Sequence, residues 1–314
     1  MTKTTIHSAC RPPSLLIVGC GYLGVRVGRS AVSRGWSVIG TTRNRVDSLA
    51  QHEIQPLRFD WNDTRDLAAI EQAIDDRHVD RILISVSYDR NSRVGRFDSQ
   101  VGGLVRLLRQ VGAASERLGR RIPDICYIST TGVYHQTGGT WVDEHATTHP
   151  TREGGRAHLQ AEAKLRSVLG SSPWTILRLS GIYGPARVPR AADVRAGRPI
   201  ASPPDGHLNL IHVDDAATAA IAAMSWAESG DSDCQDRERM YVVSDDRPVI
   251  RRQFYEEIAR QTRSAEPTFV SPTENSPVQY RSETDKRIWN RRCRRDLLPQ
   301  LRFPTYVEGL RAIL

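Results

Sequence analysis

Short apolar runs alternate with longer amphipathic segments along the first 180 residues of the chain. Each apolar run has the length of a buried strand, and each longer segment repeats its apolar residues with the period of a helix. This alternation predicts an α/β fold, a Rossmann-type doubly wound parallel sheet with right-handed crossovers. The predicted strands are Leu15–Gly19, Trp36–Thr41, Ile54–Phe59, Arg81–Val86, Ile122–Ser129 and Thr175–Leu179, and the predicted helices are 22–34, 64–77, 94–118 and 152–169.

The pattern changes after about residue 180, where proline and glycine cluster within 184–206 and a loop-rich segment follows at 264–282. We expect a small C-terminal α/β lobe that packs on the sheet edge and forms a substrate cleft beyond the carboxyl ends of the strands. The predicted elements here are helices 213–226 and 249–262, a strand Met240–Ser244 and a last helix Tyr306–Leu314, with a polar loop at 227–238. The expected division is a disordered tail 1–14, a dinucleotide-binding Rossmann domain 15–180 and a substrate lobe 181–314, of which 213–244 returns to the Rossmann core.

Three glycines, Gly19, Gly21 and Gly24, join the first predicted strand to the first predicted helix. In a dinucleotide-binding βαβ unit the first glycine permits a tight turn, the second lets the backbone approach a pyrophosphate, and the third lets helix and strand pack closely. The phosphates would lie at the helix N-terminus, with Tyr22 and Leu23 among the contact residues, because free N–H groups and the helix dipole favour negative charge there. A purely structural turn is the alternative for the bare pattern.

The residues after the second strand favour NADP over NAD as the cofactor. An NAD site usually has a carboxylate there for the ribose 2′-hydroxyl, whereas this chain reads Gly-Thr-Thr-Arg-Asn-Arg. Thr42 and Arg43 can donate hydrogen bonds to a 2′-phosphate, with Arg45 as a further donor, unless Arg43 is merely a surface residue. Asp60 could accept from the adenine amino group or only begin a helix. Ser85 is a further candidate contact, unless its hydroxyl satisfies a backbone turn.

Composition and charge exclude several classes of protein. No apolar run approaches the roughly 18 residues that span a bilayer, and residues 1–14 lack the apolar core of a secretory signal. The five cysteines form neither a CxxC pair nor a metal spacing, so we expect reduced thiols, a cytoplasmic location and no bound metal. The net charge is +8, and a basic group near the end, without interleaved aromatic residues, indicates a solvated helix face or a phosphate contact rather than nucleic-acid binding. Its members are Arg287, Arg291, Arg292, Arg294 and Arg295.

Three further stretches, 127–134, 178–185 and 210–216, carry a family resemblance. They resemble, in order, the Ser/Thr-bearing strand end, the Arg-x-x-x-Ile/Val-Tyr-Gly-Pro segment and the Ile-His-Val-Asp-Asp segment of extended short-chain dehydrogenases/reductases. With the glycine loop, four motifs occur in the family's order across nearly the whole chain. The chain thus resembles the NAD-dependent epimerase/dehydratase family of nucleotide-sugar enzymes. Its closing segments, 286–290 and 303–310, look most similar to an atypical, YeeZ-like branch.

The resemblance implies a mechanism from which this sequence departs. In that family a Tyr-x-x-x-Lys pair supplies a phenolate base, and a Ser or Thr hydroxyl holds the substrate oxygen during hydride transfer. Thr130 fills the Ser/Thr position, and the family's helical Asn falls at Gln100. Aligning Glu162 with the family's usual Glu places Gly154 at the Tyr position and His158 at the Lys position. The Asp-Glu pair of the dehydratases is replaced by Thr131 and Gly132, which disfavours dehydration.

The candidate catalytic residues are therefore Thr130, His158 and Tyr134. His158 could exchange protons near neutral pH, or only bind the cofactor ribose or face solvent. Tyr134 could approach the substrate, although its family counterpart mostly shapes the pocket. His212 and Asp214 are interpreted as structural, with an aspartate capping the next helix. The candidate substrate contacts are Tyr88, Thr131, Arg178, Tyr183 and Arg187. Arg178 and Arg187 could bind a substrate phosphate or carboxylate, or form structural salt bridges instead.

Two functions remain open from the sequence. The first is an NADP-dependent oxidoreductase or epimerase acting on a hydroxyl or carbonyl group of a sugar-like small molecule, phosphorylated or nucleotide-linked. The second is a non-catalytic NADP-binding sensor or regulatory protein that has lost the tyrosine. Neither involves a membrane or nucleic acid, and we expect a monomer or a homodimer.

Overall fold

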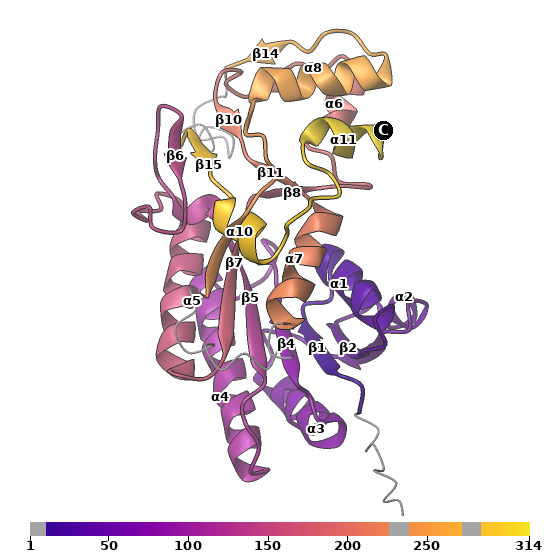
Figure 1. The fold of residues 1–314 in the computed structure, drawn as a ribbon, viewed down its shortest axis with the longest axis vertical. Helices are drawn as coiled ribbons and strands as arrows, with labels where there is room; N and C mark the ends of the chain where they lie inside the picture. The colour runs from indigo at the N-terminus through magenta and orange to yellow at the C-terminus, as the bar shows by residue number, and fades with distance from the viewer. Residues whose placement is uncertain (1–10, 226–238, 272–283) are drawn as a thin grey trace, which may run out of the picture.

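The computed structural model describes residues 11–225, 239–271 and 284–314. A seven-stranded sheet forms its centre, in the strand order β12-β7-β5-β4-β1-β2-β3, and all adjacent strands run parallel (Figure 1). The predicted doubly wound sheet is therefore confirmed. Its strands are β1 (Ser14–Val18), β2 (Ser37–Thr42), β3 (Gln55–Arg58), β4 (Arg81–Ile84), β5 (Asp124–Thr130), β7 (Trp174–Leu179) and β12 (Met240–Val243).

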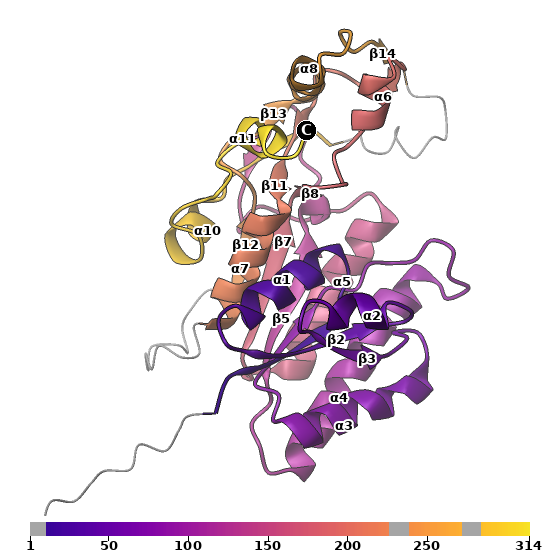
Figure 2. The same cartoon turned by 90° about the vertical axis from the view of Figure 1, so that its right-hand side faces the viewer.

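Helices cover both faces of the sheet because the side chains of each strand alternate between two cores. Leu15 and Ile17 of β1 pack in a core with the first and seventh helices, whereas Leu16 and Val18 pack in another with the third, fourth and fifth. The helices are α1 (Tyr22–Val32), α2 (Val46–Ala50), α3 (Leu67–Arg77), α4 (Gly103–Arg117), α5 (Glu153–Leu169) and α7 (Val213–Ser225). Figure 2 shows α1 and α7 on one side of the sheet and α3 and α4 on the other. Among the described residues, no helix has the length and apolar character needed to cross a membrane.

A smaller lobe lies beyond one end of the sheet (Figure 1). Its core gathers Tyr183, Phe254 and Tyr306 from distant parts of the chain. The lobe helices are α6 (Ala191–Arg195), α8 (Arg251–Thr262) and α11 (Tyr306–Arg311). Short strands pair around it: β8 (Gly181–Tyr183) with β11 (Leu210–His212), β9 (Ile200–Ala201) with β14 (Phe269–Val270), β10 (His207–Leu208) with β13 (Val249–Ile250), and β6 (Thr140–Val142) with β15 (Lys286–Ile288).

The chain crosses between the sheet and the lobe more than once. α7 packs against α1, β12 extends the sheet beside β7, and α10 (Arg291–Asp296) packs on β12. Much of the expected tail, the 227–238 loop and the larger part of the 264–282 segment fall outside the described residues. At the start of the chain, Arg11 differs from the expected disordered tail, because its guanidinium pairs with Asp80 at 2.7 Å and Ser14 begins β1.

A buried ion pair joins α5 to β7. Arg178 donates to both carboxylate oxygens of Glu162, at 3.0 and 2.7 Å, and the two side chains are 4% and 0% exposed. Ser129 of β5 donates to the same carboxylate at 2.6 Å, and Arg178 also donates to the Tyr134 hydroxyl at 2.8 Å. The charges are thus compensated by hydrogen bonds from three elements, as buried charges require.

We expect Glu162→Gln to lower the free energy of unfolding by about 3–5 kcal/mol, because the Arg178 charge would remain buried without a counterion. Urea denaturation at pH 7 measures this loss. The matched control is Glu153→Gln on the same helix, since the Glu153 side chain is 54% exposed and its pair with Arg96 should contribute below about 1 kcal/mol. Equal losses in the two variants would contradict a stabilising role for the buried pair.

Candidate functional site

The loop between β1 and α1 adopts a conformation that only glycine allows. Gly19 has a φ of +87°, and a Cβ there would lie 2.8 Å from the backbone nitrogen of Val86. A Cβ on Gly24 would lie 2.9 Å from the Gly19 carbonyl oxygen. Two neighbouring strand ends hold the loop: Thr41 Oγ1 accepts from the Gly19 N–H at 2.8 Å, and Ser85 Oγ donates to its carbonyl at 2.8 Å.

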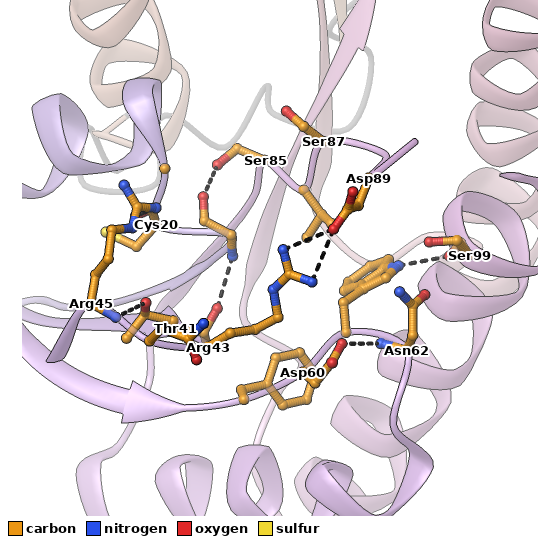
Figure 3. A pocket seen from close by; sticks show the side chains of 17 residues that line it. Cys20, Thr41, Arg43, Arg45, Asp60, Asn62, Ser85, Ser87, Asp89 and Ser99 are labelled. Atoms are coloured by element: carbon orange, nitrogen blue, oxygen red, sulfur yellow. Dashed lines mark hydrogen bonds and ion pairs between the residues drawn. The ribbon is translucent and has the colours of Figure 1, made fainter. Parts of the chain in front are cut away.

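This loop opens into the glycine-loop cavity, of about 380 Å³ (Figure 3). Gly21 caps α1 without a side-chain hydrogen bond, and the first turn of α1 carries no acidic residue, so its N–H groups suit an anion. A Cβ on Gly21 would have the Arg45 guanidinium as its near neighbour, at 3.9 Å. The close backbone, the helix N-terminus and the arginine together fit the pyrophosphate of a dinucleotide.

An ion pair lies among the residues that line the same cavity. Arg43, after β2, donates to Asp89, after β4, at 3.1 and 3.2 Å (Figure 3). The Asn91 N–H and the Arg43 guanidinium hold the pKa of Asp89 below its usual range. Asp60, which the sequence proposed as an adenine contact, lines the cavity and accepts from the Asn62 N–H at 3.0 Å. Asp89 was missed by the sequence analysis, although loops after parallel strands meet at one sheet edge.

Six of the ten predicted cofactor residues line the glycine-loop cavity, while Gly24 packs against Gly19 and His158 lines a different cavity. The six are Gly19, Gly21, Thr42, Arg43, Asp60 and Ser85. The side chains of Tyr22 and Leu23 lie elsewhere: Leu23 packs in the core, and the Tyr22 hydroxyl donates to the Pro185 carbonyl at 3.0 Å. These two residues therefore offer a cofactor only their backbone N–H groups.

Two further cavities meet at the carboxyl end of β5. We call them the α5 cavity, of about 550 Å³, and the lobe cavity, of about 410 Å³; Thr130, Gly132 and Arg152 line both. Among the lining residues that the structure describes, Glu153 alone carries a carboxylate. The cationic side chains are Arg90, Arg96, Arg152 and Arg156 in the α5 cavity, and Arg152, Arg190, Arg251 and Lys286 in the lobe cavity.

Thr130 stands where these two cavities meet. It caps the short helix η3 (Thr131–Val133), and its Oγ1 accepts from the Gly132 N–H at 3.0 Å. A hydroxyl has one hydrogen to donate besides its lone pairs, so Thr130 can still donate to a substrate oxygen. Thr131, predicted as a substrate contact, lines the lobe cavity and is 8% exposed.

His158 lines the α5 cavity, but a hydrogen-bond chain keeps its imidazole neutral. Arg96 donates to Gln100 Oε1 at 3.2 Å, which leaves Gln100 Nε2 to donate to His158 Nε2 at 3.2 Å. The proton of His158 is then on Nδ1, 2.9 Å from the Tyr127 hydroxyl. Burial lowers the pKa of His158 to about 4, and Arg96 adds to the shift. This geometry corrects the prediction that His158 exchanges protons near neutral pH.

The position of the missing tyrosine faces an arginine. A Cβ on Gly154 would lie 3.6 Å from Arg96 Nη1, and Gly154 lines the α5 cavity. Arg96 is held there by Glu153, at 3.1 Å, and by the ring of Tyr88, whose centroid lies 4.1 Å from the guanidinium carbon. Tyr88, predicted as a substrate contact, thus supports Arg96. Neither Arg96 nor Tyr127 was identified as a site residue from the sequence.

Three predicted site residues are buried in structural roles, which corrects those assignments. The Tyr134 hydroxyl, predicted as catalytic, accepts from Arg178, and burial raises the pKa of Tyr134 to about 12. Arg178, predicted to bind substrate, is occupied by Glu162 and Tyr134. Tyr183, also predicted to bind substrate, is fully buried in the lobe core.

The remaining arginines have neighbours of their own. The Arg187 guanidinium, predicted to contact substrate, lies over the ring of Tyr22 at 5.3 Å. In the C-terminal basic group, Arg294 pairs with Asp246 at 3.3 Å and Arg295 pairs with Asp296 at 2.6 Å. These contacts favour the interpretation of that group as a set of local ion pairs.

Comparison with known proteins gives consistent matches. Residues 15–243 match the profile of the NAD dependent epimerase/dehydratase family. Protein YeeZ of Escherichia coli strain K12 is 30% identical over 253 residues, covering 78% of this chain and 82% of YeeZ. The structure of a functionally unknown conserved protein from Silicibacter pomeroyi DSS superposes with a TM-score of 0.75 at 27% identity, over 96% of this chain and 98% of that one. These matches confirm the resemblance that the motifs predict.

A more distant match shows the fold alone. UDP-glucuronic acid 4-epimerase from Bacillus cereus, solved with UDP-glucuronic acid and NAD, has a TM-score of 0.75 at 17% identity. The superposition covers 95% of this chain and 97% of the epimerase. The sheet and the lobe are therefore arranged as in a sugar epimerase.

We expect His158→Asn to flatten the pH dependence of stability between pH 6.5 and about 4. In that interval His158 is protonated in the unfolded state but neutral in the folded state. The free energy of unfolding of the wild-type protein therefore decreases as the pH falls. The loss should be on the order of 2 kcal/mol, allowing for solvent screening. Urea denaturation at pH 7, 6, 5 and 4.5 measures it, with the exposed His149→Asn as control. Parallel curves for wild type and His158→Asn would contradict the buried, neutral histidine.

Proposed function

Because the chain belongs to the NAD dependent epimerase/dehydratase family, we propose that it is an NADP-dependent oxidoreductase or epimerase acting on a hydroxyl or carbonyl group of an anionic, sugar-like compound. One observation carries the proposal: the glycine-loop cavity and the two cationic cavities open at the carboxyl ends of neighbouring strands, β1, β4 and β5. A parallel sheet binds its ligands at that edge.

The chemistry divides between cofactor and chain. A bound nicotinamide cofactor supplies or accepts hydride. Thr130 would donate a hydrogen bond to the substrate oxygen, and Arg90, Arg152 and Arg190 would bind a phosphate or carboxylate of the substrate. The B. cereus epimerase was solved with a ligand that carries both groups, UDP-glucuronic acid, which makes phosphorylated and nucleotide-linked sugar acids the first compounds to test.

NADP is favoured over NAD by the residues after β2. Arg43 and Arg45 line the glycine-loop cavity, and the stretch from Thr41 to Arg45 contains no carboxylate. The pair between Arg43 and Asp89 is partly exposed, so exchanging Asp89 for a 2′-phosphate costs little. A doubly charged phosphate is the stronger partner for a guanidinium.

A non-catalytic NADP-binding sensor is the second candidate. Two observations favour it: glycine occupies the position of the family's tyrosine, and His158 is held neutral by hydrogen bonds on both ring nitrogens. Such a protein would bind the cofactor without turning over a substrate.

We expect the wild-type protein to bind NADPH more tightly than NADH, and Arg43→Ala to weaken NADPH binding roughly 10- to 100-fold, the effect of losing hydrogen bonds to a charged group. Binding of NADH should change little. Isothermal titration calorimetry measures both affinities, and the exposed Arg34→Ala, beyond the end of α1, is the matched control. Unchanged NADPH preference in Arg43→Ala would remove the role proposed for Arg43.

Turnover separates the enzyme from the sensor. On a panel of sugar phosphates, nucleotide sugars and sugar acids, the enzyme should oxidise or reduce at least one member, followed as NADPH absorbance at 340 nm or as epimer formation. Thr130→Ala should lower kcat about 10- to 100-fold, because one hydrogen bond to the reacting oxygen is lost. Tight NADPH binding without turnover on any member would favour the sensor.

A further inference from the structure

Lysine is rare in this chain. Only three of its 44 lysines and arginines are lysine. Lys164 is exposed on α5, Lys3 lies outside the described residues, and Lys286 lines the lobe cavity. An arginine side chain stays charged at any relevant pH, whereas a lysine can release its proton. Lys286 is therefore a side chain, in the wall of a cationic cavity, that can act both as an acid and as a base.

The backbone around Lys286 orients this side chain inward. β15 pairs with β6, and residues 286, 288 and 290 are buried while 287 and 289 are less so, as the two-residue period of a strand requires. Asn209 fixes β15 through both atoms of its amide: it donates to the Lys286 carbonyl at 2.8 Å and accepts from the Ile288 N–H at 2.8 Å. Asn290 anchors the far end through the Ser244 carbonyl at 2.9 Å.

The surroundings of the amine favour its neutral form. The Lys286 side chain is 8% exposed, and its Nζ donates to the Tyr134 carbonyl at 3.3 Å. Burial, together with the charge of Arg152, lowers the pKa of Lys286 to about 8. Asp285, the neighbouring carboxylate, opposes this shift, but it also accepts from the His207 N–H and lies 2.8 Å from His207 Nδ1. Arg190 and Arg251 also line this cavity, and the Arg190 guanidinium is paired with Asp193 at 3.1 Å.

We propose that Lys286 is the proton donor and acceptor for the substrate, at the cavity that Thr130 also lines. This inference rests on the proposed function, which supplies the hydride carrier. It explains how a chain that has glycine in place of the catalytic tyrosine could still move a proton: the group comes from the C-terminal lobe strand β15 instead of from α5. The same assignment gives the Lys-Arg-Ile-Trp-Asn segment a chemical role.

When a carbonyl is reduced, hydride from NADPH adds to the carbon, and the Lys286 ammonium gives its proton to the oxygen, so the products are an alcohol, NADP⁺ and a neutral amine. Solvent then returns a proton to the amine. In the oxidative direction the neutral amine would take the hydroxyl proton while hydride passes from the carbon to NADP⁺. Thr130 donates to the same oxygen in both directions.

A labelling experiment tests Lys286 without any substrate. The folded wild-type protein is treated with trace acetic anhydride from pH 6 to 11, and acetylation of each lysine is measured by peptide mass spectrometry. We expect Lys286 to react with a midpoint near pH 8, well below that measured for the exposed Lys164 in the same samples. Arg152→Gln should move the Lys286 midpoint upward, because a neighbouring positive charge is removed. A Lys286 midpoint equal to that of Lys164, or no reaction at any pH, would overturn the proposal.

Kinetics test the proton transfer. Using a substrate from the panel, Lys286→Arg and Lys286→Met should each lower kcat at least 100-fold while KM changes little, the range for loss of general acid–base catalysis. Wild-type reduction should slow above about pH 8, and Lys286→Arg should lose that limb. Lys286→Arg keeps the positive charge and a donor for the Tyr134 carbonyl. A near-normal kcat in this variant would mean that Lys286 has only a structural role, and it would overturn the proposal. Lys164→Gln is the control for an exposed lysine.

Two further measurements separate this inference from the proposed function. Thermal denaturation should show both Lys286 variants folded, and calorimetry should show wild-type NADPH affinity in Lys286→Met. If the wild-type protein does not bind NADPH, the proposed function is wrong. The labelling experiment would still show whether Lys286 is an acid–base group in the cavity. NADPH binding without turnover of any panel member would overturn the assignment of Lys286.

Discussion

The ion pair of Glu162 and Arg178 is buried, and it fixes the relative positions of the elements that form the α5 cavity and the lobe cavity. Its carboxylate receives hydrogen bonds from Ser129 on β5 and Arg178 on β7, and the same arginine donates to the Tyr134 hydroxyl. The Tyr134 carbonyl in turn accepts from Lys286. Since an unpaired buried charge is strongly unfavourable, these partners are confined to one arrangement. The ion pair thereby connects the helix that lacks the family's tyrosine to the strand that carries the lysine.

Most of the sheet could be predicted because its signals are local. Leu15 to Val18 are apolar at every position, as a strand buried on both faces must be, and the glycines after them require one turn geometry. The order of Arg11 was not predictable, because it rests on Asp80, 69 residues away. The fourth helix also begins differently from its pattern, with a π-helical turn at Asp98–Gly102 that places Gln100 against His158. Periodicity alone does not distinguish such a turn from an α-helix.

The position of a candidate site residue could be predicted where the residue lies in the glycine motif or directly after a parallel strand, as at Gly19, Arg43 and Thr130. Arg178 and Tyr183 belong to equally clear motifs, yet both are buried. The spacing of a motif identifies such a residue, but it does not distinguish a structural role from a role in binding or catalysis. Asp89 and Lys286 were not predicted as site residues because their partners are distant in the chain. Asp89 pairs with Arg43. Lys286 contacts the Tyr134 carbonyl and is affected by the Arg152 charge.

The two-residue period of β15 makes this part of the chain sensitive to insertions and deletions. A shift of the strand by a single residue against β6 would turn Lys286 outward and bring Arg287 to the inner face. The net charge of the cavity wall would be unchanged, but a side chain that can release a proton would be replaced by one that cannot. The two hydrogen bonds between the Asn209 amide and β15 oppose that slippage. An amide with no acid–base chemistry of its own would therefore determine which basic group the cavity presents.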